Sequence, residues 1–426
     1  MARVGLLVAL VAAVFAVGAP VASADVTWCG SGETAANRVP DAVAGRLVHV
    51  VYAYPSDGVD AFPTAASDIA SVVAKVDAWW QGQDPTRTPR FDLYAFPGCS
   101  GFGALDISVV KLPYSAAQLT PDDDRFSLIE RAVPSFEPGV KPLVFYDGPL
   151  DDVDLCGVAA GDPESGSGSL AVLLSRSSCM TGIAGEAAVT AHELTHELGS
   201  PTTFSPHACL DPQEIGHVCD STRDLMSPYL SFDSIDDLVL DVGRDDYYRQ
   251  GGRQFDLSAS GWLRHLDAQQ QPLALALSGG GTVTSDIPGV ACSTSCTTQW
   301  ESGTTVVLEA VPAAGKRFVG WKGGCTGDYC SLNVGAPTAV QAVFAPARVR
   351  LTARVAGRGN VVGAGISCPR RCSASVAGGE ALTLRTKAAK GWRFAGWSGA
   401  CRGTRPTCRL VPQAAVAVAA RFARAR

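Results

Sequence analysis

The 426-residue sequence predicts an α+β domain, with helices on a mixed sheet, followed by two small all-β repeat domains. Three observations predict this organisation. Strand-like and helix-like stretches alternate through residues 25–268, as they do in domains that layer helices on a sheet. Residues 272–426 are rich in Gly, Val, Thr and Ala, and their short β-like runs repeat along the chain. The 14 cysteines divide into six before residue 270, four in 292–330 and four in 368–408, which indicates disulfides within separate domains.

Residues 1–24 have the features of a secretory signal peptide. Arg3 provides a positive start, residues 4–21 are almost uninterruptedly apolar, and residues 22–24 (Ala-Ser-Ala) form the small-x-small pattern of a signal-peptidase site. No later segment is long and apolar enough to span a membrane, and an even cysteine count suits an oxidising compartment. We therefore expect a secreted, extracellular protein whose mature chain begins near Asp25. A single N-terminal membrane anchor is the alternative.

Residue periodicity predicts the elements of a first domain at residues 25–270. Residues 46–54 are β-rich, and residues 64–81 repeat apolar side chains at spacings of three and four, which predicts an amphipathic helix. The remaining predicted strands cover 91–96, 106–112, 143–146 and 170–174, and the remaining helices cover 124–133 and 184–198. Beyond residue 198, four prolines indicate a mostly irregular subdomain, which ends in a short helix around His265.

The C-terminal part of the chain repeats itself at a distance of 76 residues. Four landmarks recur, since Cys292, Cys296, Trp321 and Cys325 return as Cys368, Cys372, Trp397 and Cys401. The Gly before each Trp fits a tight turn. These repeats resemble the internalin-type B-repeat of bacterial secreted and surface proteins, which implies small β-rich modules without catalysis at 279–346 and 347–426. Residues 278–282 have the composition of a linker, and the four cysteines of each repeat leave three pairings open.

Charge is segregated between the two parts of the chain. Residues 25–278 contain 15 Lys+Arg and 36 Asp+Glu, a net charge of −21, whereas residues 279–426 contain 19 Lys+Arg and 5 Asp+Glu, a net charge of +14. This asymmetry predicts different tasks for the two parts. A basic C-terminal part favours an anionic partner such as a cell-surface polymer or nucleic acid. The alternative is an exposed β-domain whose charges are simply solvated.

The motif that points to chemistry is His192-Glu193-Leu-Thr-His196, on the predicted helix 184–198. Histidines at i and i+4 lie on one helical face, one turn apart, so both rings can bind one zinc ion. The opposite face is apolar and consists of Ala187, Ala191, Leu194 and Leu198. Zn²⁺ would lower the pKa of a coordinated water, and Glu193 would take its proton and pass it to the leaving amine of a peptide. The alternative is a helix with two solvated or buried histidines and no metal.

Two further residues extend this motif. Gly199 follows His196 by three residues, and Met226 lies downstream in Asp-Leu-Met-Ser-Pro. HExxHxxG with a later Met-turn resembles the metzincin family of zinc peptidases, over roughly residues 45–268. The resemblance implies that Gly199 turns the chain toward a third zinc ligand and that Met226 forms a hydrophobic floor beneath the metal. The family places its third ligand three residues after this Gly, where this chain has Thr202, a poor zinc ligand.

The third ligand must therefore come from further along the loop. We favour His217, because it immediately precedes the Met-turn and the neighbouring Cys219 could hold it in place. His207 is the alternative, and Asp220 is a third candidate. Cys209 and Cys219 could bridge each other and close this loop.

The sequence contains candidates for two other kinds of metal site. A different class of zinc peptidase takes its third ligand from a Glu on a downstream helix, and Glu214 is the nearest candidate, but its neighbours Pro212 and Gly216 do not favour a helix. The acidic runs 122–124 and 151–154 could bind Ca²⁺. Neither has a recognisable calcium-loop spacing, so solvated turns are the alternative.

The sequence thus predicts a secreted zinc-dependent endopeptidase that acts on an extracellular protein or peptide, with the repeats as spacer or surface-binding modules. One rival is a non-catalytic cell-surface or cell-wall binding protein on a peptidase scaffold, and another is a zinc amidase that acts on wall peptides. The presence of Glu193 favours an enzyme, whereas Thr202 at the usual ligand position argues the other way. Hydrolase nucleophile elbows, phosphate loops and dinucleotide fingerprints do not stand out.

Overall fold

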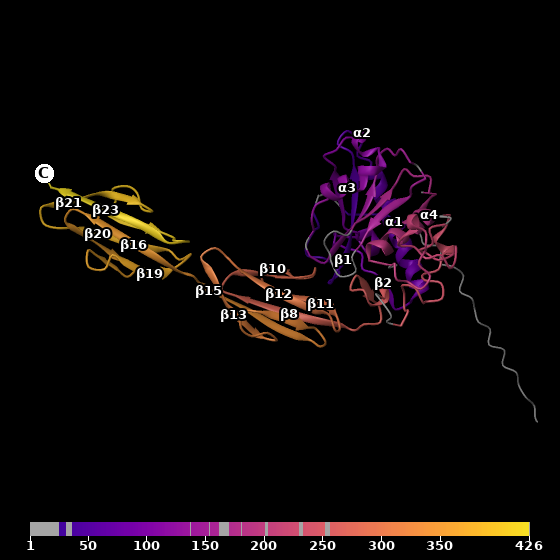
Figure 1. Cartoon of the computed structure of the whole chain (residues 1–426). Coiled ribbons are helices and arrows are strands. Elements are labelled where there is room, and N and C mark those ends of the chain that lie inside the picture. The colour runs from indigo at the N-terminus through magenta and orange to yellow at the C-terminus, as the bar shows by residue number, and fades with distance from the viewer. Residues whose placement is uncertain are drawn as a thin grey trace, which may run out of the picture.

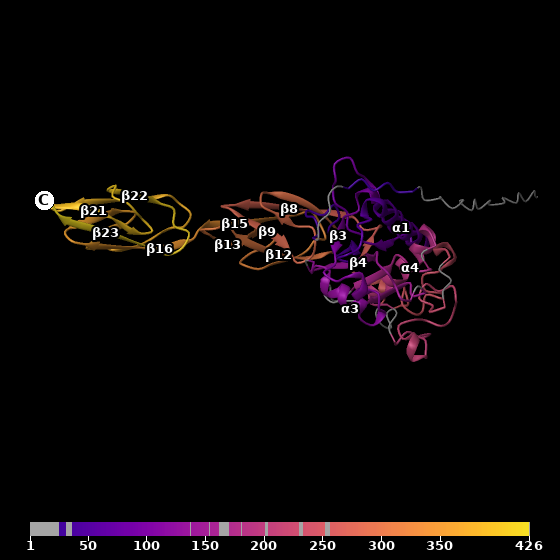
Figure 2. The same cartoon turned by 90° about the horizontal axis from the view of Figure 1, so that it is seen from above.

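The computed structural model describes residues 25–30, 36–136, 138–152, 154–161, 170–179, 181–200, 203–229, 233–251 and 256–425. The predicted signal peptide and Thr202 lie outside these residues. Figure 1 shows three bodies in a row, with the helix-containing N-terminal domain at one end and the second β-repeat at the other. The view from above in Figure 2 keeps this order, so the two repeats extend away from the N-terminal domain end to end.

A five-stranded sheet in the order β3-β1-β4-β6-β5 forms the centre of the N-terminal domain. β1 (Leu47–Tyr54) runs parallel to both neighbours, β3 (Ile107–Lys111) and β4 (Val140–Tyr146), and β4 runs parallel to β6 (Leu170–Leu174). The edge strand β5 (Gly157–Ala160) is antiparallel to β6. The sheet is therefore mixed, as predicted. β1 is buried almost throughout, which is typical of strands covered on both faces.

Helices cover both faces of this sheet. α1 (Phe62–Gln83) and α4 (Ile183–Glu197) contact each other and share one hydrophobic core with alternate side chains of β1. α2 (Ala116–Leu119) and α3 (Asp122–Ala132) share a second core with the other side chains of β1, as the two-residue period of a strand requires. α1 begins two residues earlier than predicted, because Pro63 fits the first helical turn, where its missing N–H is not needed.

The strand predicted at residues 91–96 is wrong. This segment makes only isolated bridges, such as those of Phe91 with Val48 and Leu93 with Leu105. The alternation of apolar and polar residues predicted a half-exposed strand. Instead Asp92 is fully buried, and its Oδ2 bonds to Nδ1 of His49 at 2.8 Å.

Two segments at the end of the N-terminal domain also differ from prediction. His265 ends β7 (Leu263–His265), which pairs antiparallel with β2 (Arg87–Pro89), so the helix predicted around His265 is wrong. Pairing with a distant segment overrides the weak local preference of so short a stretch. Residues 278–282, predicted as a linker, instead form the turn between two strands, with Gly279 and Gly280 at φ of 90° and 94°.

Each repeat consists of two four-stranded sheets around its own core. The strands of the first repeat are β8 (Gln270–Ser278), β9 (Gly281–Ser285), β10 (Ala291–Cys292), β11 (Cys296–Glu301), β12 (Thr305–Pro312), β13 (Lys316–Gly323), β14 (Cys330–Asn333) and β15 (Thr338–Pro346). The strands of the second repeat are β16 (Arg348–Ala356), β17 (Gly359–Gly363), β18 (Ile366–Cys368), β19 (Ser373–Ala377), β20 (Leu382–Ala388), β21 (Trp392–Gly399), β22 (Thr407–Leu410) and β23 (Val416–Arg424). The sheet orders are β10-β9-β12-β14 and β11-β8-β15-β13, then β18-β17-β20-β22 and β19-β16-β23-β21.

Seven disulfides join cysteines within the same domain, as the cysteine distribution predicts. The pairs are Cys29–Cys99, Cys156–Cys179, Cys209–Cys219, Cys292–Cys296, Cys325–Cys330, Cys368–Cys372 and Cys401–Cys408. So many disulfides are typical of proteins that fold outside the cytoplasm. Within the described ranges, no helix has the length and apolar character needed to cross a bilayer.

The first repeat packs directly on the N-terminal domain. The guanidinium of Arg90, in the N-terminal domain, lies 2.7 Å from the carboxylate of Glu301, at the end of β11, and both side chains are largely buried. The backbone N–H of Gly45 donates to the carbonyl of Pro288 at 2.8 Å. Ala44 packs against the core of the repeat that contains Trp300. These contacts hold the repeat in a defined place beside the N-terminal domain.

Candidate metal centre

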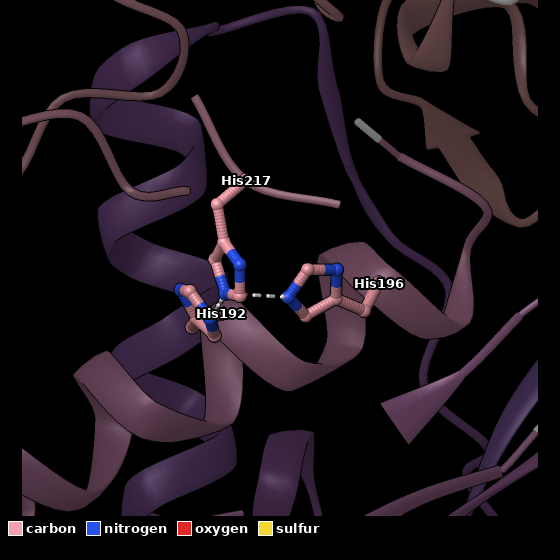
Figure 3. A group of neighbouring side chains, drawn as sticks. All are labelled: His192, His196 and His217. Carbon is pink, nitrogen blue, oxygen red and sulfur yellow. Dashed lines mark hydrogen bonds between the residues drawn. The ribbon is translucent and has the colours of Figure 1, made fainter. Parts of the chain in front are cut away.

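Three histidine rings converge at the C-terminal end of α4 (Figure 3). His192 and His196 lie one turn apart on this helix, and its other face is buried in the first core, as its apolar side chains predict. His217 comes from the loop that follows. Its Nε2 lies 3.2 Å from Nε2 of His192 and 3.3 Å from Nε2 of His196.

The contacts of the Nδ1 atoms indicate the tautomers of two of these rings. Nδ1 of His192 lies 2.6 Å from the carbonyl oxygen of Leu225, and Nδ1 of His217 lies 3.3 Å from that of Glu214. A carbonyl only accepts, so each Nδ1 carries the proton and each Nε2 carries a lone pair. Burial also lowers the pKa of His192 to about 4 and the pKa values of His196 and His217 below the ordinary range. The three rings are therefore neutral near pH 7, the form that binds metal.

A small hairpin brings His217 to this position. The Cys209–Cys219 disulfide closes it, and the N–H of Cys209 donates to the carbonyl of His217 at 2.9 Å. His207 lies on the other arm, where its Nδ1 is 3.0 Å from Asp246 Oδ2. Of the two histidines considered from the sequence, the structure thus places His217 beside the helical pair, and His207 in a separate group with Asp220 and Asp246.

Glu193 lies beside the histidines and is almost fully buried. Burial raises the pKa of its carboxyl to about 8, which suits a group that accepts and then releases a proton near neutral pH. Gly157, in the edge strand β5, leaves room for this side chain. A Cβ at Gly157 would lie 2.6 Å from Glu193 Cγ and 2.8 Å from its Oε1.

The turn that contains Met226 supports two of the three histidines. The carbonyl of Leu225 accepts from His192, and the carbonyl of Met226 accepts from the N–H of Val218, next to His217. The Met226 side chain is fully buried. Asp224, which was not predicted from the sequence, holds this turn. Its carboxylate accepts from the N–H of Met226 at 2.8 Å and from the hydroxyl of Tyr247 at 2.9 Å. In the sequence, the position of Asp224 two residues before Met226 is the feature that could have identified it.

Gly199 ends α4 with φ of 93°, a conformation that favours glycine, and its N–H donates to the carbonyl of His196. Lys141, on β4, donates from Nζ to the carbonyl of Glu197 at 2.8 Å and so holds the same helix end against the sheet. Lys141 could not be predicted from the sequence, because a lysine within a strand has no local pattern that indicates such a contact.

The histidines and Glu193 open into a cleft of about 720 Å³. One wall is β5 and the segment before it, from Asp154 to Gly161. The other wall comes from the hairpin and the Met-turn, through Ile215, Gly216 and Pro228. An extended chain could therefore lie between an open strand edge and the three rings.

The predicted calcium runs do not form a comparable group. Asp151 pairs with Arg125 at 2.9 Å, and Asp152 accepts the N–H of Asp154 at 2.9 Å. The side chains of residues 122 and 123 lie outside the described part of the structure, and no other residue of either run belongs to a group of three potential ligands. A second group of potential metal ligands, His49, Asp92 and Asp106, does form. However, Asp106 forms an ion pair with Arg38, and all three side chains of the group are fully buried.

Loss of the hairpin disulfide should weaken metal binding. We expect Cys209→Ser/Cys219→Ser to lower zinc affinity about 10- to 100-fold, because the arm that positions His217 becomes free to move. Cys29→Ser/Cys99→Ser removes a disulfide remote from the histidines and is the control. Competition titration with a zinc chelator measures both, and equal losses in the two variants would refute this role for the hairpin.

A methyl group at Gly157 should displace the Glu193 carboxylate without removing the metal site. If Glu193 is the general base that the sequence motif predicts, Gly157→Ala should lower peptide hydrolysis about 100-fold and leave zinc affinity unchanged. Ala160→Ser, in the same strand, is the control. Retention of full activity by Gly157→Ala would show that the position of Glu193 is not critical.

Comparison with known proteins gives a clear result for the C-terminal part alone. The search of curated proteins returned no match. Among solved structures, metalloproteinase-II from Bacteroides fragilis aligns with a TM-score of 0.23 and 13% identity over 47% of this chain, which spans about half (52%) of that protein. OgpA from Akkermansia muciniphila aligns with TM-scores of 0.28 for the wild type and 0.30 for a catalytically inactive form bound to an O-glycopeptide substrate. Both OgpA alignments have 10% identity and cover 92% and 91% of this chain and 98% of OgpA.

These TM-scores lie below 0.5, so no conclusion about fold or function rests on them. The C-terminal match is of a different kind. Residues 272–348 and 351–426 each match the family model of the divergent InlB B-repeat domain, which agrees with the repeat found in the sequence and with the two similar double-sheet bodies. The C-terminal part of this chain is therefore a tandem of divergent InlB B-repeat domains.

Proposed function

We propose that this chain is an exported zinc-dependent endopeptidase with His192, His196 and His217 as zinc ligands. The spacing of the three Nε2 atoms is the observation that carries the proposal. Ligand nitrogens at 2.0–2.1 Å in a tetrahedral zinc site lie about 3.3 Å apart. In this structure Nε2 of His217 lies 3.2 Å from Nε2 of His192 and 3.3 Å from Nε2 of His196. A cation bound between the rings would be stabilised by the lone pairs that neutral imidazoles direct at one another at this distance.

The chemistry divides between the metal and Glu193. Bound zinc supplies a Lewis acid that makes water acidic and polarises a carbonyl. Glu193, buried beside the histidines, takes the proton of the attacking water and delivers it to the leaving amine. The cleft along β5 holds the peptide in extended form beside these groups.

We further propose a metzincin-like arrangement of residues 25–270. Gly199 ends the active-site helix, and the Met226 turn carries the carbonyls that orient His192 and the hairpin. The departure from the family is the length of the loop. The third ligand is His217, supplied by a disulfide-closed hairpin, instead of the residue three positions after Gly199.

Hydrolysis of protein by zinc-free and zinc-restored enzyme tests this function. The chelated mature chain should not cleave casein, and one equivalent of Zn²⁺ should restore cleavage. A second assay offers a cell-wall peptide amide, because a zinc amidase would use the same residues. Zinc binding without cleavage of either substrate would favour a binding protein on a peptidase scaffold.

A further inference from the structure

The positive charge of the C-terminal part lies almost entirely in its second repeat. Residues 347–426 contain 16 Lys+Arg and one acidic residue, Glu380, whereas residues 279–346 contain three Lys+Arg and four Asp+Glu. The two repeats have the same sheet arrangement. The fold therefore does not require this charge, and it is a property of the second copy.

Five of these arginines lie on the outer face of one sheet, β19-β16-β23-β21. Side chains alternate between the two faces of a strand, and the inward residues of β16 and β23 form the core. The outward arginines, all exposed, are Arg348, Arg350, Arg354, Arg393 and Arg421, which we term the arginine face. Small side chains separate them, namely Ser373, Ser375, Ala417, Ala419 and Ala423. Arg348 to Arg354 alone spans about 20 Å along β16, at about 3.3 Å per residue.

Neighbouring serines hold two of these guanidinium groups against the sheet. Nε of Arg348 donates to Ser375 Oγ at 3.3 Å, and Nε of Arg350 donates to Ser373 Oγ at 3.0 Å. No ion pair forms among residues 347–425, all of which the structure describes. The guanidinium groups of Arg348 and Arg350 are thus held in place by the serines, and the arginines of this face remain available to an external anion.

The first repeat lacks this face. The pairing of parallel strands gives equivalent positions in the two repeats. Leu351 lies opposite Val416 in the second repeat, and Leu273 lies opposite Thr338 in the first. At the places of four of the arginines, Arg348, Arg350, Arg354 and Arg421, the first repeat has Gln270, Pro272, Ala276 and Val343. The first repeat therefore provides a natural reference for the second.

We propose that the arginine face binds a linear phosphodiester polymer at the cell surface. Arginine forks bind phosphate oxygens in pairs, and a row of several charges matches a polymer better than a single small anion. The rings of Trp397 and Phe422 are buried in the core, and Trp392 and Phe394 pack against that core. The outer face therefore lacks the aromatic platform of single-stranded nucleic-acid binders. The exposed large apolar residues of this repeat, Val362 and Val411, lie outside this sheet, so no anchor for lipid insertion is present on the face.

Substitution by residues of the first repeat tests the proposal in the full mature chain. Arg348→Gln/Arg354→Ala/Arg421→Val should weaken binding to immobilised poly(glycerol phosphate) at least about tenfold at moderate salt, through loss of three phosphate contacts. Arg385→Ala/Lys387→Ala/Arg409→Ala removes the same charge from the opposite sheet and should change affinity less than about threefold. The reverse change, Ala276→Arg/Val343→Arg in the first repeat, should strengthen binding.

Three results would overturn the proposal. Equal losses in the two triple variants would mean that net charge, and not this face, determines binding. Unchanged binding in the first variant would exclude the face altogether. Tighter binding of single-stranded DNA or of anionic lipid vesicles than of poly(glycerol phosphate), at equal phosphate concentration, would assign the face to a different partner. Unfolding temperatures of all variants, measured in parallel, separate loss of contacts from loss of fold.

Discussion

Glu193→Gln is expected to lower peptide hydrolysis by about 10²- to 10⁴-fold, the range for loss of a general base, while zinc remains bound. The amide has nearly the size of the carboxyl and fits the same buried site beside Gly157. It cannot take a proton from water, so only that step is lost. Steady-state cleavage of casein and zinc content per chain, measured on the same preparation, check both parts of the prediction.

Glu186→Gln makes the same chemical change in the first turn of α4, six residues before His192, and is the matched control. It should retain activity close to that of the unmodified chain. If Glu193→Gln kept more than half of the activity, Glu193 would not be the base. If this variant lost zinc, the change would have damaged the metal site, and the loss of activity would say nothing about proton transfer.

His217→Ala is expected to lower zinc affinity by more than about 100-fold, since loss of a direct ligand should exceed the 10- to 100-fold cost of losing an outer contact. His207→Ala is the matched control, because His207 lies on the other arm of the same hairpin and contacts Asp246. It should leave zinc affinity unchanged. Chelator competition on both variants decides between the two histidines, and loss of zinc in His207→Ala alone would contradict the proposed ligand set.

The first domain could be predicted largely from local patterns. The spacing of apolar residues in α1, and the opposed faces of α4, determine which side of each helix meets the sheet, and the structure confirms both. The prediction of a strand at residues 91–96 was wrong because the polar residue Asp92 is buried and bonds to His49. An ordered polar contact inside the core has the same sequence pattern as an exposed strand face.

Of the candidate metal site, the sequence alone could predict the pair His192 and His196 but not the third ligand. The pair on α4 follows from helical geometry, whereas a third ligand depends on the path of the loop after Gly199. His207 and His217 flank one disulfide, Cys209–Cys219, and differ only in which arm of the hairpin faces the helix. That choice depends on the Met226 carbonyl and on Asp246, distant groups that no local pattern reveals.

Diffraction from crystals of the purified chain, recorded on both sides of the zinc absorption edge, is the decisive measurement for the proposed metal centre. We predict one anomalous peak per chain, about 2.0–2.1 Å from Nε2 of His192, His196 and His217, with the Glu193 carboxylate directed toward it. A zinc-loaded crystal without a peak at these rings, or with His207 in place of His217, would contradict the proposal.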